Sequence, residues 1–323
     1  MRLWSEDIEA LRDEARQVVA AGMAVIAEQF GDGGTVPEDP TERVLAQRER
    51  FARNFAPVPE AVEREIAGVR CRVFVPDVPA TAIYVHFHGG GMVLGAPEMN
   101  DGGNLDLCRR FGMAVVSVDY RLAPEHPYPA GPDDGVAVVS WLLEHGAAEF
   151  GSARILMGGE SAGGYMTAAV ALRVRDELHA AERIDGLNLV FGVYDWGRSP
   201  SQRGIRPVDG PDMLTPEGIE LFTDSYLPGR TDDERRDPAI SPAFADLRDM
   251  PPALFSVGTA DHLLDDTLML ASRWVAAGNE AELFVAPDMP HGFMAFPCGI
   301  TKTWAKRTNE WFADILARPP RAS

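Results

Sequence analysis

Short apolar runs alternate with helical segments along most of this chain, and this alternation restricts its fold more than any other feature. The apolar runs cover residues 69–75, 82–88, 113–119, 154–158, 187–193, 253–257 and 281–285. Helical patterns separate most of them, at 133–145, 162–179 and 264–277. Strands that are apolar throughout and joined by helices are typical of a mostly parallel sheet with helices on both faces. The sequence therefore predicts an α/β fold.

One of these runs leads into a pattern that is typical of a nucleophile. Residues 154–158 are followed by the pattern G-x-S-x-G at 159–163, and a helical segment begins at once. In this pattern the serine occupies a sharp, strained turn, and the small residues on each side let the two backbones pass closely. Such a turn exposes the Ser161 hydroxyl beside the positive end of the helix dipole. The alternative is a glycine-rich helix start with an N-capping serine, but the placement between strand and helix favours the nucleophile.

Three consecutive glycines, Gly89, Gly90 and Gly91, follow the run at 82–88. Their backbone N–H groups carry no Cβ nearby and suit an oxyanion hole, whose donors must point at a developing negative charge. The alternative is a flexible turn. His88 precedes the glycines, and we expect it to hold the loop by hydrogen bonds. His86 and His88 share one strand face, but no third ligand stands at a suitable spacing, so no metal site is predicted.

A hydroxyl nucleophile needs a base, and the base needs a carboxylate that orients it. His291 lies just after the last apolar run, on a loop that can reach the carboxyl edge of the sheet. Asp261 follows the run at 253–257, whereas Asp265 and Asp266 fall in the first turn of a helix, where acids are ordinary partners of the helix dipole. The order Ser161, Asp261, His291 is typical of α/β-hydrolases.

Charge and cysteine content restrict the partners and the compartment. The 323 residues include 49 acidic and 30 basic side chains, which give a formal net charge of −19. Such a surface repels nucleic acid and anionic lipid, and the apolar stretch at 18–27 is too short for a membrane anchor. Three cysteines without a C-x-x-C pattern indicate free thiols, so we expect a cytoplasmic protein.

Two segments fall outside the alternation. Residues 1–30 carry an apolar stripe at helical spacing. A Gly- and Pro-rich loop at 31–40 follows, and then a charged helical piece that runs through Phe55. We expect the stripe to be buried at the mouth of the active site; the alternative is that it packs on the back of the sheet. Residues 194–240 are polar and hold one predicted helix at 216–226. An insertion of this length between strands is usually a lid or a binding segment.

The chain resembles the bacterial hormone-sensitive-lipase-like carboxylesterases (family IV) of the α/β-hydrolase superfamily over about residues 65–320. The shared motifs are HGGG at 88–91, DYRLAPE at 119–125, GESAGG at 159–164, SPAFAD at 241–246, Asp261 with Asp265 and Asp266 behind it, and HGF at 291–293. The resemblance implies an α/β-hydrolase fold with a mostly parallel eight-stranded sheet, flanking helices and a helical cap. It implies Ser161 as nucleophile, His291 as base, Asp261 as its orienter, and an oxyanion hole from the glycine loop and Ala162.

The resemblance also divides the chain into a cap and a catalytic domain. Residues 1–55 and 195–240 correspond to the cap, and residues 56–194 and 241–323 to the catalytic domain. Two positions near the site depart from the family pattern: Glu160 replaces the common Asp, and Met92 replaces an aromatic residue. We expect both to contribute to the substrate pocket. The resemblance favours a homodimer that pairs through the last strand.

The function predicted from these observations is hydrolysis of small to medium acyl esters, a small-molecule reaction without a cofactor. An amidase, formamidase or carbamate hydrolase with the same triad is the first alternative. A ligand-binding protein on an inactive hydrolase scaffold is a more distant one, since such proteins lack part of the triad and every member is present here.

Overall fold

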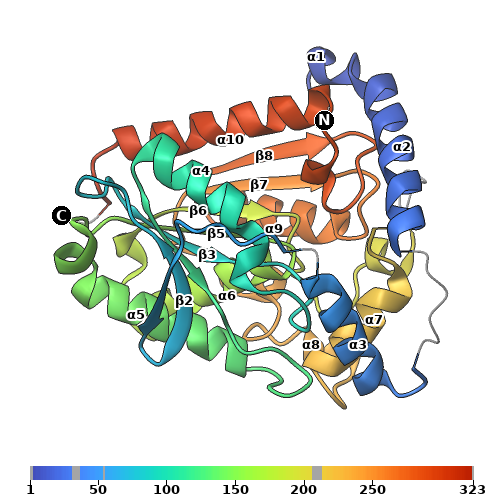
Figure 1. Ribbon diagram of the computed structural model, residues 1–323, viewed down its shortest axis with the longest axis horizontal. Helices are drawn as coiled ribbons and strands as arrows, with labels where there is room; N and C mark the ends of the chain where they lie inside the picture. The colour runs from blue at the N-terminus through green and yellow to red at the C-terminus, as the bar shows by residue number, and fades with distance from the viewer. Residues whose placement is uncertain (1–2, 31–36, 54, 206–212, 322–323) are drawn as a thin grey trace.

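The computed structural model describes residues 3–30, 37–53, 55–205 and 213–321, and it has the predicted α/β architecture (Figure 1). A single sheet of eight strands runs through the molecule in the order β1-β2-β4-β3-β5-β6-β7-β8. The strands are β1 Val62–Ile66, β2 Val69–Phe74, β3 Ile83–Phe87, β4 Ala114–Val118, β5 Ile155–Glu160, β6 Ile184–Val190, β7 Ala253–Gly258 and β8 Ala281–Ala286. Only the β1–β2 and β2–β4 pairs of this sheet are antiparallel.

The seven predicted strands are confirmed to within three residues at each end. The sequence did not predict β1, whose residues Val62-Glu-Arg-Glu-Ile66 are mostly exposed on the edge of the sheet. In contrast, every residue of β3, β4, β6 and β7 is buried, which explains their continuous apolar character. Burial of one such Val or Leu side chain contributes about 1.5–3 kcal/mol.

Helices cover both faces of the sheet. The helices are α1 Glu6–Glu9, α2 Arg12–Phe30, α3 Pro40–Ala52, α4 Asp101–Phe111, α5 Ala130–Phe150, α6 Ala162–Asp176, α7 Pro216–Tyr226, α8 Asp232–Arg235, α9 Leu264–Ala276 and α10 Gly299–Ala317. One face packs against α4 and α10, with Cys108, Trp311 and Phe312 in its core. The other face packs against α5, α6 and α9, with Leu142, Val170 and Trp274 in its core. The predicted helix at 216–226 is confirmed as α7.

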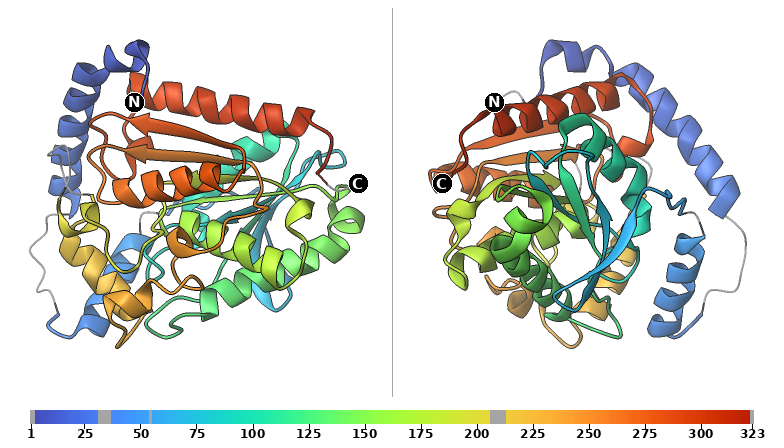
Figure 2. Two further views of the ribbon diagram at one scale, coloured as in Figure 1. Left: turned by 180° about the vertical axis from the view of Figure 1, so that it is seen from behind. Right: turned by 60° about the vertical axis from the view of Figure 1, so that its left-hand side comes forward.

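The carboxyl ends of the parallel strands meet at one edge, and the additional helices gather there. Figure 2 shows α2, α3 and α7 beyond this edge rather than on either face of the sheet. In α2, Ala15 and Val19 pack with Phe293 and Phe296 of the loop that follows β8. The stripe on residues 1–30 therefore covers this loop, next to the strand ends, and not the back of the sheet.

None of the described helices combines the length and the apolar character that crossing a bilayer requires.

Candidate active site

Ser161 lies on a sharp turn between β5 and α6, as the sequence predicts. Its backbone has φ 57° and ψ −119°, a conformation that non-glycine residues rarely adopt. A Cβ on Gly163 would lie 1.9 Å from the carbonyl oxygen of Phe87, and one on Gly159 would lie 2.2 Å from the same atom. Glycine is therefore required at both positions, because the turn presses directly against the end of β3.

Three side chains that follow the ends of β5, β7 and β8 form a hydrogen-bonded chain. Ser161 Oγ lies 2.9 Å from His291 Nε2, and His291 Nδ1 lies 2.9 Å and 3.1 Å from the two carboxylate oxygens of Asp261. Asp261 is completely buried, and Phe191 packs edge-on against the His291 ring at a centroid distance of 4.7 Å. With its carboxylate on Nδ1, the imidazole presents Nε2 as an acceptor to the serine hydroxyl.

The two neighbouring carboxylates of α9 have different contacts. Asp265 accepts a hydrogen bond from the amide of Ser201. Asp266 accepts hydrogen bonds from the amides of Tyr194 and Asp195 and from the side chains of Ser199 and Gln202. Burial raises the pKa of Asp266 to about 7, although these hydrogen bonds oppose the shift. Both carboxylates thus fix the start of the 194–240 insertion. The sequence showed only acids in a first helical turn and gave no signal for this role.

The glycine loop runs beside Ser161. Backbone amides of Gly90, Gly91 and Ala162 have no hydrogen-bond partner among the described residues. Gly89 borders the same cavity and lies against the backbone of Glu160. These amides are therefore available to a ligand beside the serine.

His88 holds the glycine loop from beneath. Its Nδ1 lies 2.8 Å from the carbonyl oxygen of Gly89, and its ring stacks on Tyr120 at a centroid distance of 4.3 Å. Burial lowers the pKa of His88 to about 4, so the ring is neutral at ordinary pH. Within the described part of the chain, no group of three or more His, Cys, Asp or Glu residues is arranged to hold a metal ion.

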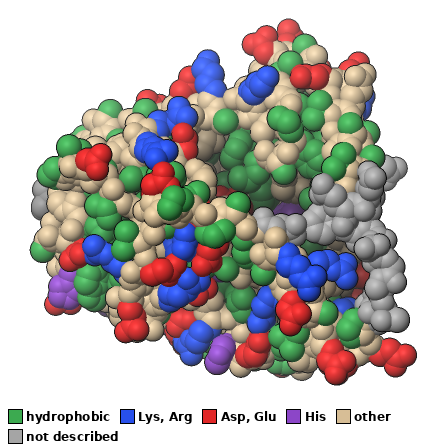
Figure 3. All heavy atoms as spheres, in the orientation of Figure 1, with side chains coloured by type: hydrophobic (Ala, Val, Ile, Leu, Met, Phe, Trp, Pro, Cys, Tyr) green, Lys and Arg blue, Asp and Glu red, His purple; other side chains and the backbone are tan. Residues whose placement is uncertain are grey.

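A cavity of about 610 Å³ opens above Ser161 and His291. Its walls are mainly apolar and come from α3, from the segment after β6 and from α7: Phe51, Val193, Trp196, Leu214, Ile219 and Phe222. Figure 3 shows a hollow with hydrophobic walls on this side of the molecule. The volume suits a small-molecule ligand. Sequence reasoning did not identify these wall residues, because they come from segments without a recognisable motif.

The two predicted pocket residues differ in their positions. Glu160 lines the cavity, and its Oε2 accepts hydrogen bonds from His86 and Asn100. Met92 does not line it. Its side chain is fully buried in the core, and its methyl carbon lies 2.8 Å from the position that a Cβ on Gly131 would take. The structure therefore places Met92, whose backbone φ is 65°, in the core and not at the cavity wall.

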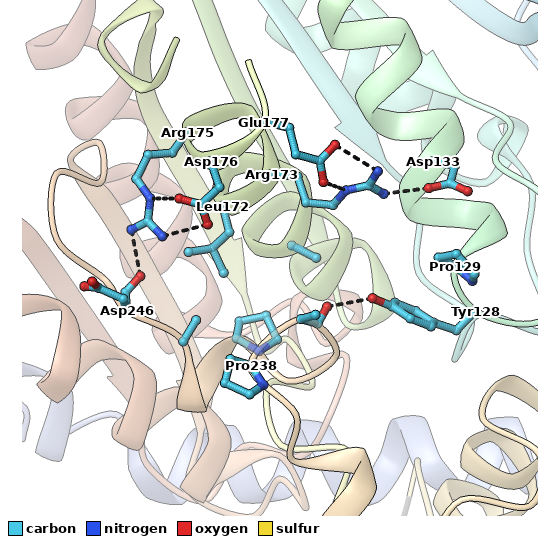
Figure 4. A pocket seen from close by; sticks show the side chains of 14 residues that line it. Tyr128, Pro129, Asp133, Leu172, Arg173, Arg175, Asp176, Glu177, Pro238 and Asp246 are labelled. Atoms are coloured by element: carbon cyan, nitrogen blue, oxygen red, sulfur yellow. Dashed lines mark hydrogen bonds and ion pairs between the residues drawn. The ribbon is translucent and has the colours of Figure 1, made fainter. Parts of the chain in front are cut away.

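A different cavity of about 510 Å³ lies between α6 and residues 238–246 (Figure 4). Its two arginines are already paired: Arg173 with Asp133 and Glu177, and Arg175 with Asp176 and the carbonyl oxygen of Asp246. Their guanidinium groups are therefore engaged by the protein itself. Neither Ser161 nor His291 borders this cavity, so the candidate site is the one above the serine.

Fold and site geometry both define an α/β-hydrolase, and comparison with known proteins agrees. A family profile described as the alpha/beta hydrolase fold matches residues 84–295. The chain belongs to the α/β-hydrolase family, within its hormone-sensitive-lipase-like branch (family IV).

Several characterised proteins are similar to this chain. Carboxylesterase NlhH of Mycobacterium tuberculosis is 36% identical over 247 residues, which cover 72% of this chain and 73% of that protein. An acetyl esterase of Salmonella schwarzengrund is 30% identical over 239 residues, which cover 73% of this chain and 72% of that protein. Among solved structures, a hormone-sensitive lipase from a metagenome library has a TM-score of 0.76 at 28% identity, covering 95% of this chain and 98% of that one. The Pyrobaculum calidifontis esterase has a TM-score of 0.74 at 26% identity, and the match covers 90% of this chain and 97% of that one.

Proposed function

We propose that this protein is a serine carboxylesterase that hydrolyses small to medium acyl esters through an acyl-enzyme intermediate. The observation that carries the proposal is the hydrogen-bonded chain Ser161–His291–Asp261 at the floor of an apolar cavity. Similarity to a carboxylesterase and an acetyl esterase supports the same reaction class.

In the first half of the reaction, Ser161 Oγ attacks the ester carbonyl while His291 Nε2 takes its proton. The negative charge that develops on the carbonyl oxygen is stabilised by the free amides of Gly90, Gly91 and Ala162. His291 then gives its proton to the leaving alcohol oxygen, and the acyl group stays on Ser161. Asp261 holds the imidazole in the required tautomer and stabilises its charged form.

In the second half, His291 takes a proton from water, which attacks the acyl-enzyme carbonyl. The same amides stabilise the second oxyanion, and collapse of the intermediate releases the carboxylic acid and returns the proton to Ser161. No step requires a group from outside the chain other than water.

We assign substrate selection to a helical cap made of residues 1–55 and 195–240, on the catalytic domain of residues 56–194 and 241–323. Support comes from Phe51 of α3 and Phe222 of α7, which line the cavity. Part of both cap segments lies outside the described residues. We further propose a cytoplasmic protein, consistent with three free and buried cysteines, and a homodimer that pairs through the edge strand β8. Light scattering on the purified protein measures the oligomeric state.

The test is the replacement Ser161→Ala combined with active-site labelling. Wild-type protein is expected to hydrolyse p-nitrophenyl butyrate and to take up one fluorophosphonate per chain on Ser161. The variant is expected to remain folded, to lose the label, and to lose several orders of magnitude in kcat, because triad members act as a unit. Retention of more than about a tenth of the wild-type kcat would overturn the proposal, since a nucleophile accounts for far more than this.

A further inference from the structure

Glu160 gives the catalytic cavity its fixed negative charge. Apart from His291, it is the one titratable side chain among the described residues that line this cavity, and no lysine or arginine is among them. Its side chain is 16% exposed, so it is partly shielded from bulk water. A shielded carboxylate without a cationic partner attracts a positive charge more strongly than an exposed one does.

Two side-chain donors, the buried His86 and the half-buried Asn100, fix this carboxylate as an acceptor. His86, whose side chain is 2% exposed, places Nε2 3.1 Å from Glu160 Oε2, and Asn100 Nδ2 donates to the same oxygen at 3.1 Å. On the far side of the ring, His86 Nδ1 lies 2.9 Å from Ser117 Oγ and 3.4 Å from Asn104 Nδ2, which can only donate to it. The proton of a neutral ring is therefore on Nε2, which donates to Glu160.

One carboxylate oxygen is consequently left for a ligand. Both protein donors bind Oε2, and Glu160 Oε1 has no hydrogen-bond partner among the described residues. The protein thus holds one oxygen of this cavity-lining side chain by two hydrogen bonds and leaves the other without a partner among the described residues.

The loop that carries His291 indicates which half of an ester Glu160 faces. In ester hydrolysis the imidazole protonates the leaving oxygen, so the alcohol half lies on the His291 side of the carbonyl. Met294 and Ala295 follow His291 on its loop. Together with Asn100 and Glu160 they border a groove of about 460 Å³ whose walls combine apolar surface with several polar side chains. The same four residues also border the catalytic cavity. The apolar walls from α3 and α7 are then left for the acyl half.

We propose that Glu160 is a specificity-determining residue that selects esters whose alcohol half carries a positively charged ammonium group. This inference rests on the proposed function, because it concerns the alcohol half of the same ester. The net charge of −19 acts in the same direction, since it attracts cationic substrates to the protein surface.

The experiment compares two butyrate esters that have the same shape and differ in charge. One has 2-(trimethylammonio)ethanol as its alcohol, and the other has the neutral isostere 3,3-dimethylbutanol. Wild-type protein is expected to hydrolyse the cationic ester with kcat/KM at least about 10-fold higher, as expected for a shielded charge pair. Glu160→Gln, which keeps the shape and an acceptor oxygen, is expected to bring the two values within about 2-fold, because only the charge is removed.

Asp106→Asn is the matched control. Asp106 borders the same groove, but its side chain is 56% exposed, pairs with Arg110 and does not border the catalytic cavity. This variant also removes one negative charge and is expected to keep the wild-type preference. An equal loss of preference in both variants would overturn the assignment to Glu160, and so would a wild-type preference below about 2-fold.

The outcomes also separate this inference from the proposed function. Equal hydrolysis of both esters by wild-type protein overturns the inference and leaves the esterase intact, whereas hydrolysis of neither overturns both. If Glu160→Gln does not fold, inhibition of the wild-type protein decides. The free ammonium alcohol is expected to inhibit hydrolysis of p-nitrophenyl butyrate at about one tenth of the concentration that its neutral isostere requires, and equal inhibition would overturn the inference.

Discussion

The carboxylates of Asp261 and Asp265 are four residues apart, yet only one of them contacts the catalytic imidazole. Asp261→Asn is expected to leave the fold intact and to lower kcat by roughly 10⁴, because an amide at this position stabilises the wrong tautomer of His291. Asp265→Asn is expected to keep a kcat near that of the wild type, since its carboxylate accepts from the amide of Ser201 instead. Steady-state kinetics on p-nitrophenyl butyrate compares the kcat values of the two variants with that of the wild type. A larger loss for Asp265→Asn would show that the orienting carboxylate is misassigned.

Single residues were predictable wherever a local motif specifies their backbone. The order of Ser161, Asp261 and His291 after β5, β7 and β8 was sufficient to predict that the three side chains meet. In contrast, no local pattern indicates that Met92 turns into the core or that His86 donates to Glu160. These contacts depend on residues that are distant in sequence, so a single chain read in order gives no signal for them.

Helix α7 packs against the glycine loop through Phe222. A Cβ on Gly91 would lie 2.4 Å from the ring of Phe222, so this ring covers the loop and forms a wall of the cavity. Phe222→Ala is expected to enlarge the cavity and to raise kcat/KM for octanoate relative to acetate esters by about 5- to 10-fold, since each added methylene gains burial. A p-nitrophenyl ester series from C2 to C12 measures this shift. An unchanged chain-length profile would contradict the assignment of this wall to the acyl half.

The contact of α2 with the catalytic loop provides a second prediction. Arg12 and Arg16 both pair with Asp288, three residues before His291. Burial would raise the pKa of Asp288, but the hydrogen bonds and charges of the two arginines hold it below its ordinary value.

The double variant Arg12→Ala and Arg16→Ala leaves the buried Asp288 without a cationic partner among the residues that the structure describes. We expect it to lower the midpoint of thermal unfolding and to lower kcat by about 2- to 10-fold, as the loop that carries His291 loosens. The chain-length profile is expected to stay that of the wild type, in contrast to Phe222→Ala. A shifted profile with normal kcat would place α2 in the substrate wall instead.

Elements could be predicted where burial imposes a clear pattern. Strands β2 to β8 and helix α7 matched the sequence, whereas β1 did not, because an exposed edge strand has no apolar periodicity to detect. The predicted helix over the first 30 residues is divided into α1 and α2, and the sequence gave no sign of that break.

At the scale of the whole molecule, two buried groups give stability opposite dependences on pH. The pKa of Asp266 is raised to about 7, so between about pH 4 and 7 the folded state holds a proton that the unfolded state has lost. The free energy of unfolding therefore falls as the pH rises through that window. The pKa of His88 is lowered to about 4 by burial, so between about pH 4 and 6.5 the unfolded state holds the extra proton. The contribution of His88 to the free energy of unfolding therefore rises with pH through this window.

In the wild type the contributions of Asp266 and His88 oppose each other. Each changes the slope of the free energy of unfolding against pH by an amount that corresponds to about one bound proton. Asp266→Asn removes the contribution that falls with pH. Between pH 4.5 and 6.5, the slope of the free energy of unfolding against pH is therefore expected to become more positive than in the wild type, by an amount that corresponds to up to about one bound proton. His88→Asn is expected to change the slope in the opposite direction. Urea unfolding at several pH values measures both, and parallel curves for the three proteins would contradict the assignment.

The backbone at Ser161 has a consequence for how such a protein can evolve. A positive φ at a residue with a side chain costs about 1–3 kcal/mol of folding free energy, and glycine avoids most of that cost. Ser161→Gly is therefore expected to unfold at a higher temperature than Ser161→Ala, which scanning calorimetry measures, although neither can react with an ester. Selection for stability alone would remove the nucleophile. The serine persists at this turn only where catalysis is selected, so a descendant of this fold that no longer needs catalysis gains stability by replacing Ser161 with glycine.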